Sequence, residues 1–414
     1  MVQSVLGSLT LGYRPLWNGA RQLAAIQLYV QDLPGSYVDA PHLLRTLQEM
    51  WSASSPPLLI SPQSRQLLLQ LLQQAPRGSP WIEVRGQWLG DSSLLEQVRQ
   101  AYRRGLRLVW RGELSDLPGG DIAACFDNSL LSLSPAEAVG ALQSSASTGQ
   151  RGVRASPILD GQMYENLPTV ALLSLCLDRH RAVAVAGWPS DDVLYSLRHQ
   201  QLQPSHATIF KLMKAIDAEQ SLDSFEHILS EDPLLAYRFL TYTNSAALGL
   251  RTGIDSLRRG LVMLGYGTLQ RWLGDQLPHA STDPNLSPIR QTMVLRAQLM
   301  ERLVEAGIEY ELRREVYLTG LLSQLDMLMD EPIATILRRL PLSERISDAI
   351  VLRSGPYAPA LQIACALETD DASVVRQLCE THEMDTESVN RALLRLLSEL
   401  HVERPRPGQP TGSR

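Results

Sequence analysis

The sequence predicts an α/β barrel followed by an all-α domain, and three observations support this prediction. In the first half of the chain, short runs of branched and aromatic residues alternate with amphipathic segments. About seven such repeats indicate parallel strands joined by crossover helices, which is the pattern of a TIM-like barrel. From about residue 206 onward only helical periodicity remains. A polar segment at residues 197–205, LRHQQLQPS, separates the two patterns.

Elements of the first half are predicted from short apolar runs bounded by turn residues and from apolar residues spaced three or four apart. The predicted strands are residues 23–30, 57–61, 81–85, 106–111, 122–126, 152–157 and 182–187. The predicted helices are residues 43–51, 64–74, 92–104, 135–142 and 167–177. This order alternates in the way that βαβ units require.

Elements of the second half are all helical, because no period of two recurs there. The predicted helices are residues 207–218, 224–230, 233–244, 256–265, 268–276, 288–306, 311–328, 332–337, 343–354, 357–368, 371–381 and 385–400. The expected organisation is a barrel domain at 1–197, a linker at 198–205, a helical domain at 206–402 and a disordered tail at 403–414. The tail, which includes RPRPGQPTGSR, offers no apolar side chain to bury.

Composition excludes several classes of protein. A hydrophobic content of 44% and a charged content of 20% are typical of a globular chain. The formal charge of −6 argues against a broad basic face for nucleic acid. No apolar run approaches the roughly 20 residues that span a bilayer, so we expect a cytoplasmic protein. The four cysteines stand alone in apolar runs and are expected to be buried free thiols.

The densest pattern is DPLLAYRFLTYTNSAALGLRTGIDSLRRGLVMLG at 232–265. Much of it has a local structural explanation: an Asp cap followed by Pro at the first helical position, Asn and Gly for a left-handed turn, and Asp255 or Ser256 as the cap of the next helix. Gly265 is expected to end that helix. The signature residues are Asp232, Pro233, Asn244, Ser245, Gly249, Ser256, Leu264 and Gly265.

This stretch and the helical half around it resemble the HDOD domain, a relative of metal-dependent HD phosphohydrolases. The resemblance covers most of residues 204–400 and includes YLTGLLSQLD at 317–326 and LRSGPYAPAL at 352–361. These later segments are most similar to HDOD domains that follow an EAL domain. Where an HD enzyme carries its metal-binding His-Asp pair, this chain has Ser323 and Gln324. The resemblance therefore implies a helical fold without its metal ligands.

The first half, in turn, resembles the EAL domain, a (β/α)-barrel phosphodiesterase for cyclic di-GMP. The shared features are the layout, RPLWNGARQLAAIQLYV at 14–30, a strand containing Glu83, and Gly105 before a strand. By this resemblance, Gln27 replaces a metal-binding glutamate, and Arg111 falls where the family has paired aspartates. The remaining landmarks fall at Gln31, Gly112, Cys125, Asp127, Ala155, Ser156, Ala186 and Gly187. The resemblance implies a degenerate barrel.

The chemistry of the replaced residues decides what we expect of both halves. Hydrolysis of a phosphodiester by two metals needs several carboxylates that hold hard cations roughly 4 Å apart. A neutral Gln27 and a cationic Arg111 cannot replace them, and residues 105–112 contain no acid. No histidine of the helical half precedes an aspartate, so surface or capping roles are expected for them. We therefore expect no catalytic residue, no metal and no cofactor.

Three functions remain open at this point. The first is a non-catalytic bacterial signalling protein that acts through protein partners near cyclic di-GMP pathways of motility or biofilm, as the two resemblances imply. In the second, the barrel binds a cyclic dinucleotide without cutting it, through arginines and stacked aromatic rings. The third is an active phosphodiesterase with an unusual site. The residues considered for the second are Arg85, Arg107, Arg111, Arg154, Trp110 and Trp188. A homodimer is also open, since leucine-rich helix faces fit either packing or association.

Overall fold

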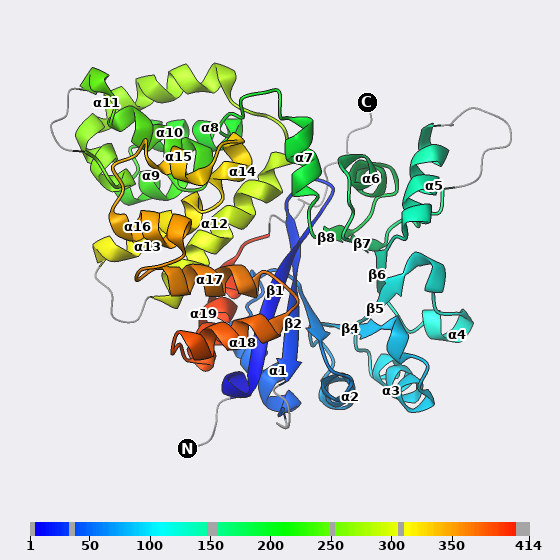
Figure 1. Cartoon of the computed structure of the whole chain (residues 1–414). Coiled ribbons are helices and arrows are strands. Elements are labelled where there is room, and N and C mark those ends of the chain that lie inside the picture. The colour runs from blue at the N-terminus through cyan, green and yellow to red at the C-terminus, as the bar shows by residue number, and fades with distance from the viewer. Residues whose placement is uncertain (1–4, 33–37, 147–155, 249–252, 305–309, 403–414) are drawn as a thin grey trace. The chain divides into compact units, whose positions relative to one another are not determined.

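The computed structural model describes residues 5–32, 38–146, 156–248, 253–304 and 310–402 (Figure 1). Contacts divide the chain into two compact units. The barrel unit holds the described residues up to Pro189, together with Glu368–Arg376 and those from Asp385 onward. The helical unit holds Ser190–Leu367 and Gln377–Met384. The last helix therefore groups with the barrel, whereas the sequence assigned it to the helical domain.

Eight strands close into a barrel in the order of the sequence, which confirms the predicted barrel. β1 runs antiparallel to both of its neighbours, β2 and β8, and every other pair is parallel. The strands are β1 (Leu9–Trp17), β2 (Leu23–Asp32), β3 (Leu58–Pro62), β4 (Trp81–Arg85), β5 (Leu108–Glu113), β6 (Asn128–Ser132), β7 (Met163–Glu165) and β8 (Ala184–Ala186).

Three strands differ from the prediction. β1, which contains Gly12 and Pro15, was not predicted; its strand conformation is supported by pairing along its whole length with β2. The predicted strand at 122–126 is wrong, because Gly120–Ala123 forms a short helix, α4, and the strand follows it as β6. Most of the predicted strand at 152–157 lies outside the described residues, and the seventh strand is β7.

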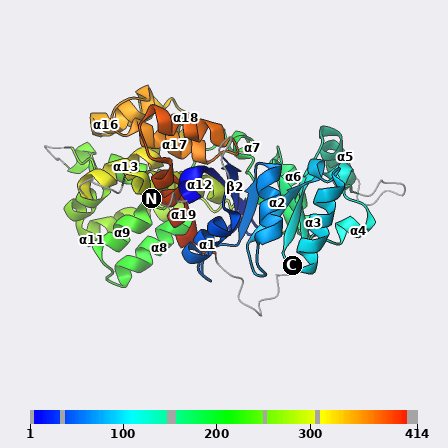
Figure 2. The same cartoon turned by 90° about the horizontal axis from the view of Figure 1, so that it is seen from below.

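Helices cover the outside of the barrel, and Figure 2 shows α1, α2 and α3 beside the strands. Side chains just before the helices accept hydrogen bonds from first-turn amides: Asp39 before α1, Ser64 before α2 and Asp91 before α3. The helices are α1 (Ala40–Met50), α2 (Arg65–Gln74), α3 (Ser92–Arg103), α4, α5 (Pro135–Ala146) and α6 (Val170–Ser174). Their buried leucines pack on the outer faces of the strands.

The last helix, α19 (Thr386–Glu399), joins the barrel unit through one buried amide. Asn390 is 0% exposed. Its side-chain nitrogen donates to the carbonyl oxygens of Leu6 at 2.8 Å and Leu9 at 2.9 Å, and its side-chain oxygen accepts from the amide of Leu11 at 3.2 Å. The amide side chain of asparagine can both donate to and accept from the backbone, so Asn390 connects α19 to the start of β1 by hydrogen bonds.

The helical unit confirms the predicted all-α half. Its helices are α7 (Ser190–Ser196), α8 (His206–Asp217), α9 (Leu222–Leu229), α10 (Pro233–Thr243), α11 (Leu257–Gln276), α12 (Leu286–Leu303), α13 (Tyr310–Leu322), α14 (Leu325–Met329), α15 (Ile333–Leu337), α16 (Glu344–Ser347) and α17 (Ala358–Leu367). The division between the units falls inside α18 (Ala372–Thr381). In the described ranges, no helix has both the length and the apolar character needed to cross a membrane.

Asp232 stands at the centre of the helical unit and is 0% exposed. One carboxylate oxygen accepts from the amides of Leu234 and Leu235, at 2.9 and 3.0 Å, and so caps α10 as predicted. The other oxygen accepts from the amide of Ser205 at 2.6 Å and lies 3.5 Å from the guanidinium of Arg290. Asp232 therefore connects the starts of α8 and α10 with α12.

The other signature residues also have structural roles. Ser256 caps α11 as predicted. Asn244 ends α10 at φ −100°, which is not the expected left-handed conformation; its side chain instead bridges Leu240 and Ile254. Gly265 takes φ 67° and ψ 164° and kinks α11, where the sequence predicted an end. Gly249 lies outside the described residues, and Leu264 is half-buried.

Candidate functional site

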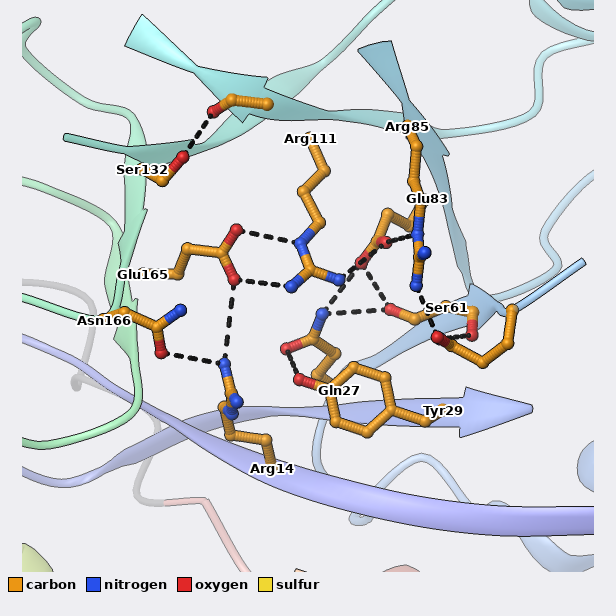
Figure 3. Close-up of polar contacts among 12 residues, drawn as sticks. Arg14, Gln27, Tyr29, Ser61, Glu83, Arg85, Arg111, Ser132, Glu165 and Asn166 are labelled. Carbon is orange, nitrogen blue, oxygen red and sulfur yellow. Dashed lines mark hydrogen bonds and ion pairs between the residues drawn. The ribbon is translucent and has the colours of Figure 1, made fainter. Parts of the chain in front are cut away.

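The barrel interior has two layers, because alternate residues of each strand point inward. One layer is aliphatic and includes Leu59, Val109, Leu130, Met163 and Ala184. The other layer is polar and lies further along the parallel strands, toward their carboxyl ends. It is formed by Arg14, Gln27, Tyr29, Ser61, Glu83, Arg85, Arg111 and Glu165 (Figure 3). This is the end of the barrel where functional groups are found in this class of fold.

Arg111 of β5 forms the centre of the polar layer. Its Nε and Nη2 donate to the two carboxylate oxygens of Glu165 of β7, each at 2.8 Å. Its Nη1 donates to Oε1 of Glu83 of β4 at 3.2 Å. Figure 3 shows the guanidinium lying between the two acids. A bidentate arginine–carboxylate pair is the strongest and most directional form of such an interaction.

On the side of Glu83 the layer is closed to solvent. Gln27 of β2 donates through Nε2 to Oε2 of Glu83 at 2.8 Å and to Oγ of Ser61 at 3.1 Å. Ser61 of β3 also donates to Oε2 of Glu83. Tyr29 donates to Oε1 of Gln27 at 3.0 Å. All four side chains are fully buried, so protein donors replace the hydrogen bonds that water would make to the carboxylate of Glu83.

On the side of Glu165 the layer opens. Arg14 of β1 lies 3.7 Å from the carboxylate of Glu165 and donates to Oδ1 of Asn166 at 3.2 Å. The exposed fraction of the side chain rises from 0% at Glu83 to 14% at Arg111 and 18% at Arg14. Arg85, 23% exposed, lies 3.6 Å from Glu83 and over the ring of Trp88. Cations therefore line the solvent side of the cluster.

The electrostatics of the cluster keep Arg111 charged and Tyr29 neutral. Burial opposes the charge on Arg111, but the carboxylates of Glu83 and Glu165 outweigh it and raise the pKa of the guanidinium. Burial also raises the pKa of the Tyr29 phenol, and the positive charges of Arg14 and Arg111 only partly offset this effect. Arg111 is thus a cation between Glu83 and Glu165, and Tyr29 is a phenol that acts as a donor.

The residues of this layer do not fit a divalent metal. Hard cations take several carboxylate or carbonyl oxygens. Here the two carboxylates hold a guanidinium, and the neighbouring side chains of Gln27 and Ser61 are neutral and already direct hydrogen-bond donors toward Glu83. Across the described ranges no group of three His, Cys, Asp or Glu side chains could hold a metal ion. A metal at this position would have to displace Arg111.

The structure separates the residues that the sequence proposed for a ligand. Trp110 is 1% exposed and packs outside the barrel with residues of α5 and α6, so its ring is not available in the interior. Trp188 is half-buried and meets Trp17 edge-on at 6.4 Å. Arg107 lies at the opposite, amino-terminal end of the strands, over the ring of Trp81. Arg154 lies outside the described residues.

Two charged residues of the cluster were missed. Glu165 lies on a strand of only three residues, MYE, between turns, and the sequence placed the late acidic landmarks at Ala155 and Ala186 instead. Arg14 was missed because β1 was not predicted. A signal for Glu165 was present: Met163 and Glu165 are separated by one residue, as inward-facing positions of a strand are.

In the helical unit, the position expected for a His-Asp pair carries ordinary structural contacts. Ser323 donates to the carbonyl oxygen of Gly320 at 2.8 Å, and Gln324 precedes α14. Gly320 lets α13 approach α12, since a Cβ atom there would lie 2.6 Å from Cα of Ala297. His382 contacts Oε1 of Gln362 at 3.0 Å.

Comparisons with known proteins identify part of the chain. Residues 202–329 match the HDOD domain family, so the chain contains an HDOD domain. The chain is 24% identical over 200 residues to a protein of Vibrio cholerae named cyclic di-GMP phosphodiesterase CdgJ, covering 48% of this chain and 46% of that one. It is 22% identical over 200 residues to the uncharacterized protein YuxH of Bacillus subtilis, covering 46% and 47%. It thus spans about half the length of these relatives.

Three chains of solved structures also match this chain. The MmoQ response regulator from Methylococcus capsulatus aligns with 47% of this chain and 98% of its own, with a TM-score of 0.37 and 16% identity.

Proposed function

We propose that this chain, an HDOD domain joined to a closed barrel, is a bacterial signal-transduction protein that works through protein partners and does not hydrolyse phosphodiesters. One observation supports the absence of catalysis most strongly. The guanidinium of Arg111 is held by Glu165 and Glu83 in the polar layer of the barrel, where a two-metal phosphodiesterase of this architecture would hold its metal ions.

The chemistry behind this proposal is a substitution of one cation for another. Divalent metals hold a phosphodiester and lower the pKa of bound water, so that hydroxide forms at neutral pH. The guanidinium of Arg111 neutralises part of the charge of Glu83 and Glu165, but it has no open coordination position and cannot activate water. The barrel would then keep its fold, stabilised by an internal ion pair, and lose the reaction.

The barrel itself is proposed to be a degenerate relative of the EAL phosphodiesterases. Its eight strands in sequence order and its acidic residues Glu83 and Glu165 support this reading. The replacement of metal ligands by Gln27 and Arg111 supports the loss of activity. In the helical unit, Ser323 and Gln324 in place of a His-Asp pair point in the same direction.

The link to cyclic di-GMP is proposed from the relative named cyclic di-GMP phosphodiesterase CdgJ, which shares about half its length with this chain. We propose that the protein acts in such a pathway by binding proteins, in the cytoplasm, without nucleic acid. A homodimer is compatible with this role, and sedimentation analysis of the full chain distinguishes a monomer from a dimer.

The test is hydrolysis of cyclic di-GMP by the purified full chain with Mg²⁺ or Mn²⁺, followed by chromatography of the products. We expect no linear dinucleotide, and its appearance in proportion to enzyme would overturn the proposal. The matched variant is Arg111→Asp, which removes the internal cation and adds a third carboxylate beside Glu83 and Glu165. Mn²⁺ should raise the melting temperature of this variant and leave that of the wild type unchanged.

The barrel as a cyclic dinucleotide sensor is the second candidate, and the contacts of Arg111 weaken it. A phosphate would have to compete with the carboxylate oxygens of Glu165 at 2.8 Å. Arg14 and Arg85 remain partly exposed at the solvent side. Calorimetric titration with cyclic di-GMP that shows no heat at high micromolar concentration would exclude this candidate.

A further inference from the structure

The helical unit contains a cavity of about 1060 Å³ that the proposed function does not use. It is lined by α7, the following polar segment, α10, α11 and the end of α14, which Figure 1 labels. The volume is in the range of small-molecule sites, which are concave and carry a few placed polar groups among aromatic and apolar side chains. Its lining was not singled out by the sequence, because it is drawn from segments more than a hundred residues apart.

Two arginines of the lining have no carboxylate partner among the residues that the structure describes. Arg238 donates only to neutral acceptors, Oε1 of Gln276 at 3.1 Å and the carbonyl oxygen of Leu202 at 3.3 Å. Arg198 donates to the carbonyl oxygen of Tyr195 at 2.7 Å and lies 3.7 Å above the ring of the same residue. Burial lowers the pKa of Arg238 and the charge of Asp232 only partly offsets this effect, so an anion in the cavity would stabilise the guanidinium.

Two carboxylates of the lining are likewise without a cation within ion-pair distance in the described ranges. They are Asp191, in the first turn of α7, and Asp330, which follows α14 in the left-handed conformation at φ 52°. The third acid of the lining, Glu331, forms an ion pair with Arg339. The cavity therefore presents arginines without a carboxylate within ion-pair distance and carboxylates without a cation within that distance, and its overall charge gives no preference for a simple anion.

Aromatic rings complete the lining. Tyr242 of α10 stacks on Trp272 of α11 with ring centroids 5.6 Å apart and planes inclined by 23°. Beside them, Oγ of Ser245 is buried and has no hydrogen-bond partner among the described residues.

We propose that this cavity binds a guanine nucleotide. Guanine offers on one edge two acceptors, O6 and N7, that match a guanidinium, and on another edge N–H donors that match a carboxylate. The phosphate is the anionic partner that Arg238 or Arg198 lacks. The flat base stacks on the ring pair of Tyr242 and Trp272. Adenine lacks the paired donors for Asp191 or Asp330 and fits less well. The proposal concerns the helical unit and does not depend on the role of the barrel.

The experiment is calorimetric titration of the full chain with GMP, cyclic di-GMP, AMP and inorganic phosphate. We expect both guanine compounds to bind, and AMP and phosphate alone to bind at least about tenfold more weakly, since each lacks a bidentate contact that guanine makes. Equal binding of AMP and GMP would overturn the choice of guanine. Absence of binding by both guanine compounds would overturn the site.

Variants locate the binding. Arg238→Gln and Arg198→Ala should each lower the affinity for GMP about tenfold. Asp330→Asn should reduce the preference for GMP over AMP, and asparagine can keep the left-handed turn. Arg198 is exposed, so its variant should fold even where that of Arg238 does not. Arg271→Ala, an exposed change on α11 outside the cavity, is the matched control. Loss of binding in Arg85→Met, with Arg238→Gln unaffected, would place the ligand in the barrel and refute the inference.

Discussion

Replacement of Arg111 by Met tests whether the guanidinium holds the barrel interior together. The change keeps most of the side-chain volume and removes three hydrogen bonds, at 2.8, 2.8 and 3.2 Å. It leaves Glu83, 0% exposed, and Glu165, 5% exposed, as carboxylates without their central cation. Breaking a buried pair by removing one partner costs about 3–5 kcal/mol.

The lower end of that range is expected here, about 3 kcal/mol. Glu165 keeps Arg14 at 3.7 Å, and Glu83 keeps Gln27, Ser61 and a distant Arg85.

The assay is urea unfolding of the full chain, with hydrogen exchange of peptides from β4 and β5 to report on the barrel, because two units need not unfold together. Adding Glu83→Gln and Glu165→Gln to the Arg111 variant should recover most of the loss, since no charge is then left unpaired. Arg85→Met is the control and should cost under about 1 kcal/mol, because this more exposed pair is partly screened. A loss below about 1 kcal/mol in the Arg111 variant, or one that the two glutamine substitutions do not reduce, would refute the reasoning.

Three further predictions concern the other buried contacts. Asp232→Ala should lower the free energy of unfolding by about 2–3 kcal/mol, because the cap of α10 is lost and the Arg290 guanidinium loses its carboxylate; Asp232→Asn should cost less in the same urea titration, since it can still cap. Asn390→Leu should cost about 2–4 kcal/mol and speed hydrogen exchange at β1, because three backbone groups lose their partner. Gly320→Ala should cost about 1–3 kcal/mol in thermal unfolding, since its Cβ atom would lie 2.6 Å from Cα of Ala297; an unchanged melting temperature would contradict this close packing.

The sequence allowed only some residues of the candidate site to be predicted. Gln27 and Arg111 were identified as non-acidic residues at positions where a hydrolase needs carboxylates, and Glu83 was placed on a strand. The partner Glu165 was missed because three-residue strands carry too few residues for a period to show. The grouping of these side chains depends on closure of the barrel, which brings β4, β5 and β7 around one axis and has no local signal.

The sequence by itself determined the classes of structure: alternating strands and helices before residue 197, helices alone after about 206, and caps such as Asp232 and Ser256. These depend on periodicity and on contacts between residues a few positions apart, so the local sequence carries them. Tertiary structure alone decided that Arg111 lies between two carboxylates, that α19 packs on β1, and that Trp110 faces outward. Each of these rests on contacts between residues distant in the chain, whose pairing is set by closure of the barrel and by packing of the whole core.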